Sequence, residues 1–256
     1  VSVTGTANLM MAATLADGET VLENVAKEPE VVFLANVLNQ CGAKIKGHGT
    51  DLLTIRGVQS LKPINCDILP DRIETGTYMI ASAITSGDVK IINCIPQQVE
   101  ALTMQLRQAG LVVEENETSL RVVGDGQLNG VNIKTQPHPG FATDLQAQFM
   151  ALMALAQGQS IIIETVFENR FMHAAELKRM GANVTIQGQT AVVNGVKELS
   201  GAPLMATDLR ASASLVLAAL AAKGKSVISR IYHIDRGYSC IEKKLCSLGA
   251  KIYREK

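Results

Sequence analysis

Apolar and polar residues recur in the same order four times along the 256-residue chain. A run that is apolar or small on nearly every side, such as 146–157, is typical of a helix buried all round. A glycine follows, and the next run is rich in valine and isoleucine, as at 160–165, which predicts a strand. A second helix is predicted after it, amphipathic because apolar residues such as Ile241, Leu245 and Leu248 recur at helical spacing.

Two series of glycines mark this repeat. The first ends each apolar helix, where it fits a C-cap, and the second precedes one or two alternating strands. Members of the first series are 69, 71 and 66 residues apart, and the second series follows 24, 23, 23 and 25 residues later. The first series is Gly18, Gly87, Gly158 and Gly224, and the second is Gly42, Gly110, Gly181 and Gly249. The chain therefore holds four copies of a helix–strand–helix–strand–strand unit.

The predicted fold class is α/β. One buried and one half-exposed helix per copy fit a sheet layer between inner and outer helices, whereas all helices of a TIM barrel lie outside its strands. Only residues 1–3 precede the first buried helix, and the last copy stops after one strand, so strands from elsewhere are expected to complete both ends. Position 1 is Val rather than Met, and we expect the chain to start part-way into a longer protein.

Composition excludes several classes of partner. Twenty-four basic and 24 acidic residues give a net charge of zero, which argues against duplex nucleic acid, because phosphate contacts need excess Lys and Arg. The longest apolar run, 214–222, is far shorter than the roughly 20 residues that span a membrane. The five cysteines are scattered without a CxxC pair, so neither disulfides nor a zinc site is predicted, and we expect reduced thiols in a soluble cytoplasmic protein.

Arginines distinguish the last two copies from the first two. Arg170 and Arg236 are predicted at the starts of outer helices, and Arg210 near the start of a buried one. Helix starts carry unpaired N–H groups and partial positive charge, so an arginine there makes a strong anion site, although it opposes the helix dipole. With two carboxylates and His173 or His233, these three arginines indicate acid–base chemistry on a polyanionic substrate. A solvated or ion-paired surface role is the alternative.

An aspartate begins three of the buried helices. Asp71, Asp144 and Asp208 occupy equivalent places, and aspartate is a preferred N-cap residue, so capping explains each of them. A capping carboxylate that faces a cleft also suits the role of a general base.

Long phrases of the chain resemble bacterial UDP-N-acetylglucosamine enolpyruvyl transferases. They are VSVTGTANLMMAATLADG, LPDRIETGTYMIASA, PHPGFATDLQAQFMAL, TVFENRFMHAAELKRMGA, SGAPLMATDLRASASLVLA and RIYHIDRGYSCIEKKLCSLGA, and the match runs in order from Val1 to Lys256. The resemblance implies two inside-out α/β barrel domains of three units each, with the active site between them. It covers the C-terminal two-thirds of the family sequence. Residues 1–69 would finish the first, UDP-sugar-side domain, and 70–256 would form most of the second.

The resemblance also implies an activity. Members transfer the enolpyruvyl group from phosphoenolpyruvate to the 3′-hydroxyl of UDP-N-acetylglucosamine and release phosphate, which is the first committed step of peptidoglycan synthesis. No metal and no cofactor is implied, and the partners are the two substrates and the upstream segment of the same enzyme. Asp144 matches the carboxylate that accepts the hydroxyl proton, and it and Arg236 are the implied catalytic residues. The implied substrate-binding residues are Val1, Ser2, Val3, Asp144, Val166, Arg170, Asp208, Arg210 and Arg236.

The family's catalytic loop cysteine and an amino-terminal lysine–asparagine pair match no residue of this chain. None of the cysteines, including Cys41 and Cys246 beside repeat glycines, fits the loop motif. We therefore expect the chain to be inactive unless its upstream part is supplied. Two alternatives stay open: the sister activity on shikimate 3-phosphate, and a binding or scaffold module that has lost turnover.

Overall fold

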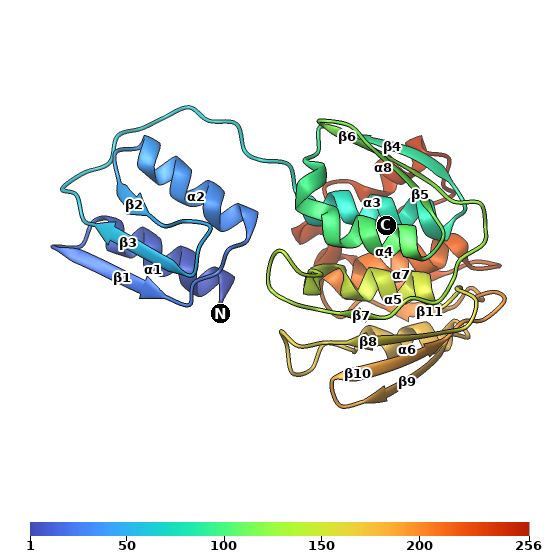
Figure 1. The fold of residues 1–256 in the computed structure, drawn as a ribbon. Coiled ribbons are helices and arrows are strands. Elements are labelled where there is room, and N and C mark those ends of the chain that lie inside the picture. Colours follow the sequence, from blue (N-terminus) through green and yellow to red (C-terminus); the bar gives the residue numbers. More distant parts are fainter. Residues whose placement is uncertain (256) are drawn as a thin grey trace. The chain divides into compact units, whose positions relative to one another are not determined.

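The predicted repeat is confirmed by the computed structural model, which describes residues 1–255 (Figure 1). The first copy is α1 (Val3–Thr14), β1 (Glu19–Glu23), α2 (Pro29–Gln40), β2 (Lys44–Lys46) and β3 (Leu52–Arg56). The second is α3 (Arg72–Ile84), β4 (Asp88–Ile92), the 3₁₀ helix η1 (Pro96–Val99), α4 (Glu100–Gln108), β5 (Val112–Glu115) and β6 (Ser119–Val123).

The two remaining copies each gain a short strand ahead of the inner helix. The third is β7 (Ile133–Lys134), η2 (Thr143–Leu145), α5 (Gln146–Met153), β8 (Gln159–Ile163), α6 (His173–Arg179), β9 (Asn183–Gln187) and β10 (Thr190–Asn194). The fourth is β11 (Pro203–Met205), α7 (Leu209–Ala221), β12 (Val227–Ser229), η3 (Ile231–Arg236) and α8 (Ile241–Ser247).

The second glycine series ends the outer helices in left-handed backbone. These glycines have φ of +104°, +101°, +95° and +99°, in chain order, a region that side-chain-bearing residues rarely adopt. The residue after each glycine donates its N–H to a carbonyl five positions back, as Ala182 does to Leu177 at 3.0 Å, which is a Schellman cap. In the first series one copy differs from prediction, because Ser86, and not Gly87, has the positive φ.

The chain divides into two compact units (Figure 1). Unit 1 contains Val1–Leu69 and the short segment Pro137–Gly140, and unit 2 contains Pro70–Gln136 and Phe141–Lys256. No local pattern in the sequence separates 137–140 from its neighbours, so its place in unit 1 was not predicted.

Unit 1 holds one copy of the repeat. Its strands form an antiparallel sheet in the order β1-β3-β2, and its core includes Met10, Val31 and Ile55. The inner helix α1 is not buried all round, because Leu9 and the C-cap residue Leu15 are each 57% exposed. Unit 1 supplies no second inner helix to cover them.

Unit 2 holds three copies, and its inner helices bury one another. Helices α3, α5 and α7 contact each other in the middle of the unit (Figure 1). Every residue of α5 is buried, as are most residues of α3 and of α7. Small residues such as Ala151 and Ala213 allow this close approach, and the core is therefore made of helices.

The layering around these helices differs from the predicted one. Strands form separate sheets in the orders β4-β6-β5, β7-β8-β10-β9 and β11-β12. In β9 only Val184 is buried, so one face of this edge strand meets solvent. Helix α6 instead contacts α7 directly as well as β9 and β11. No helix of residues 1–255 combines the length and apolar character needed to cross a lipid bilayer.

Candidate active site

Asp144 lies between two arginines in unit 2. Arg170 Nη2 donates to its Oδ1 at 2.6 Å, and Arg210 donates to its Oδ2 from Nη2 at 2.9 Å and from Nε at 3.1 Å. The side chains of Asp144, Arg170 and Arg210 are 35%, 22% and 15% exposed, so an anion can still reach them. Two guanidinium forks suit phosphate and carboxylate groups.

The ends of packed elements bring these three residues together. Asp144 lies in η2, which leads into α5, and Arg210 lies in the first turn of α7, which packs on α5. Arg170 lies in the loop before α6, which begins only at His173. Arg236 ends η3. The predicted helix-start placement is therefore wrong for Arg170 and Arg236, because the loops stay irregular or 3₁₀ for several residues longer.

Neighbouring charges decide the proton affinity of Asp144. Burial by itself raises its pKa, but the charges of Arg210 and Arg170 and their hydrogen bonds outweigh burial and hold the pKa below its ordinary value. Burial lowers the pKa of Arg210, and Asp144 and Tyr238 reverse that effect, so this pKa is raised. Asp144 is thus ionised at neutral pH, but it is a weak base while both arginines hold it.

The buried Tyr238 contacts Arg210 with both its hydroxyl and its ring. Its hydroxyl lies 2.8 Å from Thr77 Oγ1, accepts from Arg210 Nη1 at 3.3 Å and from Gln148 Nε2 at 3.4 Å, and its side chain is 1% exposed. The Arg210 guanidinium carbon is 5.8 Å from the centre of the tyrosine ring. Sequence reasoning missed this network. Its signal was present, because Thr77 and Gln148 are polar residues in runs that the sequence predicts as buried helices.

The two histidines do not join the arginine cluster. His173 is buried, and burial, with a smaller contribution from Arg170 opposed by Asp208, lowers its pKa to about 4. It is uncharged at neutral pH and contributes no cation to an anion site. His233 is half-buried and its ring lies 4.3 Å from that of Tyr232.

The aspartates at the helix starts divide into two groups. Asp71 and Asp208 are N-caps as predicted: each accepts hydrogen bonds from two backbone N–H groups at the start of α3 or α7. Asp144 makes no capping bond, and its carboxylate faces the arginines instead. The implied substrate contact of Asp208 stays a prediction.

Two further predicted residues lie on loops of unit 2. Arg236 is exposed and makes no side-chain hydrogen bond or ion pair with the other residues of 1–255, so the structure does not bring it to Asp144. Val166 is 40% exposed, beside Phe167, whose ring centre lies 4.6 Å from the Arg170 guanidinium carbon. This cation–π contact places an exposed apolar patch next to the candidate anion site.

The predicted nucleotide contacts lie at the start of unit 1. Val1 and Val3 are exposed, and the Ser2 hydroxyl caps α1 by accepting the Gly5 N–H at 3.1 Å. Their implied substrate contacts also stay predictions.

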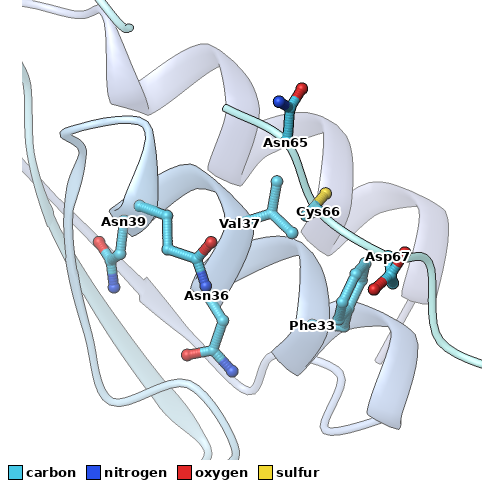
Figure 2. A pocket seen from close by; sticks show the side chains of 8 residues that line it. Phe33, Asn36, Val37, Asn39, Asn65, Cys66 and Asp67 are labelled. Atoms are coloured by element: carbon cyan, nitrogen blue, oxygen red, sulfur yellow. The ribbon is translucent and has the colours of Figure 1, made fainter. Parts of the chain in front are cut away.

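Unit 1 has a hollow that could be a second binding site, and its lining shows whether it suits an anion. It measures about 730 Å³ and is lined by Phe33, Asn36, Val37, Asn39, Gln40, Asn65, Cys66 and Asp67. Figure 2 shows amide side chains, an aromatic ring, a thiol and a carboxylate there, but no basic residue lines it. Phosphate or carboxylate groups would find no cation in this hollow, unlike at the Asp144 site.

All five cysteines are free thiols.

Metal ligands do not cluster in the part of the chain that the structure describes. Across residues 1–255, no three His, Cys, Asp or Glu side chains come together in a way that could hold an ion.

Comparisons with known proteins point in one direction. The family profile of EPSP synthase (3-phosphoshikimate 1-carboxyvinyltransferase) matches residues 1–245. Relatives named UDP-N-acetylglucosamine 1-carboxyvinyltransferase are 58% identical in Geobacter metallireducens and 57% identical in Myxococcus xanthus. Each match covers 100% of this chain and 61% of the relative, so the chain spans about three-fifths of their length.

Solved structures agree on the fold. The enolpyruvyl transferase NikO from Streptomyces tendae superposes with a TM-score of 0.89 at 28% identity, over 98% of this chain and 60% of that one. EPSP synthase from Acinetobacter baumannii superposes with a TM-score of 0.74 over 97% of this chain and 60% of that one. Because the two sequences are only 17% identical, this similarity supports the fold alone.

The repeated units around a helical core, with arginines gathered on a carboxylate, define an α/β protein of the enolpyruvyl transferase fold. The chain belongs to the EPSP synthase (3-phosphoshikimate 1-carboxyvinyltransferase) family. The predicted fold class and the resemblance to the UDP-sugar enzymes are thereby confirmed.

Proposed function

We propose that this chain provides the base and part of the anion site of a UDP-N-acetylglucosamine 1-carboxyvinyltransferase. The reaction moves the enolpyruvyl group of phosphoenolpyruvate to the 3′-hydroxyl of the UDP-sugar and releases phosphate. The observation that carries the proposal is the partly buried Asp144 held between Arg170 and Arg210. Relatives of that name at 55–59% identity support the choice of substrates.

Substrate charge would change the state of Asp144. Phosphoenolpyruvate carries a phosphate and a carboxylate, and either group competes with Asp144 for the guanidinium forks of Arg170 and Arg210. Once an arginine turns to the substrate, Asp144 keeps its burial but loses the opposing charge, so its pKa rises. The carboxylate becomes a stronger base at the moment the substrate is in place. The exposed Arg236 is free to add a third cation from its loop.

The bonds then change in two stages. The sugar hydroxyl oxygen bonds to C2 of the enolpyruvyl group, its proton passes to Asp144, and C3 takes a proton from a general acid. Phosphate next leaves C2 with its bonding electrons while C3 loses a proton, which restores the carbon–carbon double bond. The resemblance assigns the general acid to the upstream loop cysteine. Val1, Ser2, Val3 and Val166 belong in this proposal to the nucleotide site, and Asp208 to the substrate contacts.

The upstream segment is the partner that the proposal requires. Helix α1 leaves Leu9, Met11 and Leu15 exposed, whereas the inner helices of unit 2 cover one another. An apolar face of this kind is a site for further helices to pack. The relatives are longer than this chain, which leaves room for such helices. A cytoplasmic location belongs to the same proposal, because phosphoenolpyruvate is a metabolite of the cytoplasm.

Phosphate release tests the proposed reaction. The chain, supplied with the upstream part, is mixed with phosphoenolpyruvate and UDP-N-acetylglucosamine, and release is expected only with both substrates. Asp144→Asn should lower kcat by about 100-fold or more, since a general base contributes on that scale. Asp125→Asn is the matched control, because Asp125 is an exposed aspartate whose only hydrogen bond among residues 1–255 comes from the Gln127 N–H.

The outcomes separate the competing functions. Equal rates for Asp144→Asn and the control would show that Asp144 is not the general base. Faster phosphate release with shikimate 3-phosphate than with the UDP-sugar would show that the chain has the sister activity. A folded and assembled mixture that binds both substrates without release would make it a binding module.

A further inference from the structure

Glu164 is a buried carboxylate beside the arginine cluster that the proposed reaction leaves without a role. It is 1% exposed, and none of the ion pairs formed within residues 1–255 includes it. It is held by four hydrogen bonds instead. Oε1 accepts from the Thr135 hydroxyl at 2.8 Å and from the backbone N–H groups of Val166 at 2.8 Å and Phe167 at 3.2 Å, and Oε2 accepts from the Thr143 hydroxyl at 2.8 Å. Burying a carboxyl group is costly unless hydrogen bonds compensate for the lost water, so this placement calls for a reason.

Strand register brings these partners together. Strands β7 and β8 run parallel with Lys134 opposite Ile163, so Thr135 and Glu164 follow at the same sheet end. The Gln136 N–H donates to the Phe141 carbonyl at 2.9 Å. This bond holds Phe141, two residues before Thr143, beside the end of β7. Glu164 therefore joins the segment that carries Asp144 to the loop that carries Arg170.

The Thr143 hydroxyl transmits the effect of Glu164. A hydroxyl has one hydrogen to donate, and Glu164 accepts it, so the Thr143 oxygen is left as an acceptor. Arg170 Nη1 donates to that oxygen at 2.6 Å, and its Nη2 donates to Asp144 Oδ1 at 2.6 Å. The direction of the Thr143 hydroxyl thus fixes how the Arg170 guanidinium meets Asp144.

We propose that Glu164 is a positioning residue of this site: it orients Thr143, and through Thr143 the Arg170–Asp144 pair, while it holds the backbone of Val166 and Phe167. The orienting role follows from these contacts. Its consequence for turnover rests on the proposed function.

Four variants isolate the orienting role. In Glu164→Gln the amide oxygen can still accept from Thr135, Val166 and Phe167, but the amide N–H₂ faces Thr143 and removes its acceptor. Thr143→Val deletes the hydroxyl, and Thr143→Ser restores it. Glu168→Gln is the matched control, because Glu168 is an exposed glutamate of the same loop.

The first readout does not depend on activity. Carboxyl ¹³C NMR of the 256-residue chain, recorded against pH, follows the ionisation of Asp144. Loosening Arg170 should raise the pKa of Asp144 by about 1 pH unit in Glu164→Gln and Thr143→Val. Thr143→Ser and Glu168→Gln should match the wild type. Unfolding midpoints identify any variant that fails to fold, and Thr143→Val then carries the test. The same Asp144 pKa in every folded variant would overturn the proposal.

The second readout is turnover with the upstream part supplied. We expect kcat to fall on the order of 10- to 100-fold in Glu164→Gln and Thr143→Val, as for a misplaced catalytic group. KM for the UDP-sugar should change less, and the acidic limb of the rate profile should move to higher pH. Normal turnover in Glu164→Gln would overturn the role in catalysis. An inactive wild type with the pKa change present would instead contradict the proposed function and leave the orienting role in place.

Discussion

Asp144 and His173 show how neighbours decide what burial does to a single residue. Burial favours the uncharged form of both side chains. Two arginines touch Asp144, so it stays ionised with its pKa below the ordinary value. No hydrogen bond reaches His173 Nε2 within the described residues, and burial wins, with a pKa of about 4. The same burial that makes one residue chemically useful keeps the other neutral.

His173 should make stability depend on pH. Its folded pKa of about 4 lies below the ordinary value of 6.5, so the unfolded chain binds a proton first as pH falls. The contribution is complete above the unfolded pKa and is lost as pH falls from there to the folded pKa, by about 3 kcal/mol over the whole window. Urea unfolding at pH 7, 6, 5 and 4.5 measures it.

Matched histidine variants attribute this loss. His173→Gln should flatten the fall in unfolding free energy between pH 6.5 and 4.5, whereas His233→Gln should keep the wild-type slope. Equal slopes in both variants would contradict the assignment to His173. Asp144, with its lowered pKa, loses its contribution at still lower pH, so the two effects separate along the pH axis.

A third series of glycines closes the first three copies of the repeat. Gly57, Gly124 and Gly195 directly follow the last strand of their copies, and each donates its N–H to a first-series glycine carbonyl, at 3.0, 2.8 and 3.0 Å. At Gly195 an added Cβ would lie 1.5 Å from the Ala156 carbonyl oxygen. The end of the strand therefore touches the end of the inner helix backbone to backbone, and only glycine fits there.

Substitution at this junction should be costly. Gly195→Ala should lower the free energy of unfolding by about 3 kcal/mol, because a backbone carbonyl cannot rotate away as a side chain can. Gly188→Ala is the control: φ is +57° there and no atom lies within 4 Å of the added Cβ, so only the left-handed backbone costs, about 1 kcal/mol. Chemical denaturation of both variants compares them. A smaller loss at Gly195 than at Gly188 would refute the close-contact explanation.

At the scale of the whole molecule, similar inner helices meet different surroundings. The apolar residues of α3, α5 and α7 are covered by one another in unit 2. Those of α1 are covered only on the side that carries Met10 and Ala13. The difference lies in the number of copies per unit, because a helix that is apolar all round needs neighbours on all sides.

The exposed face of α1 should be needed for assembly but not for folding. Leu9→Gln with Leu15→Gln should change the unfolding free energy of this chain by only about 0.5 kcal/mol, as is usual at exposed positions. The same pair should weaken association with the upstream part, measured by sedimentation of the mixture, and reduce phosphate release. Met104→Gln with Leu248→Gln, two exposed apolar residues of unit 2, is the control. Normal association of the α1 variant would show that the upstream part packs elsewhere.

Periodicity by itself determined the repeat, the order of its elements, the buried inner helices of unit 2 and the outer-helix glycines, but not the exposed face of α1. These features depend on residues a few positions apart, so local sequence is sufficient to predict them. The capping roles of Asp71 and Asp208 were predictable for the same reason. The family followed from long phrases and not from physics. The need for glycine at Gly57 and Gly195 was not predicted from the sequence, because the carbonyl atom that excludes a side chain there lies about forty residues away in the chain.

Only the tertiary structure decided which charged residues meet. Arg170 and Arg210 lie 26 and 66 positions from Asp144 in the sequence, and the contact of Arg210 with Asp144 depends on α5 packing against α7. Capping was a sound local reading of Asp144, and the arginines overrode it. Glu164 and Tyr238 carried no signal of their own in the sequence, because a buried polar residue is recognised by its partners. Only the polar Thr77 and Gln148, which contact Tyr238, stood out there. Local patterns fix elements, whereas proton affinity depends on distances that only the folded chain sets.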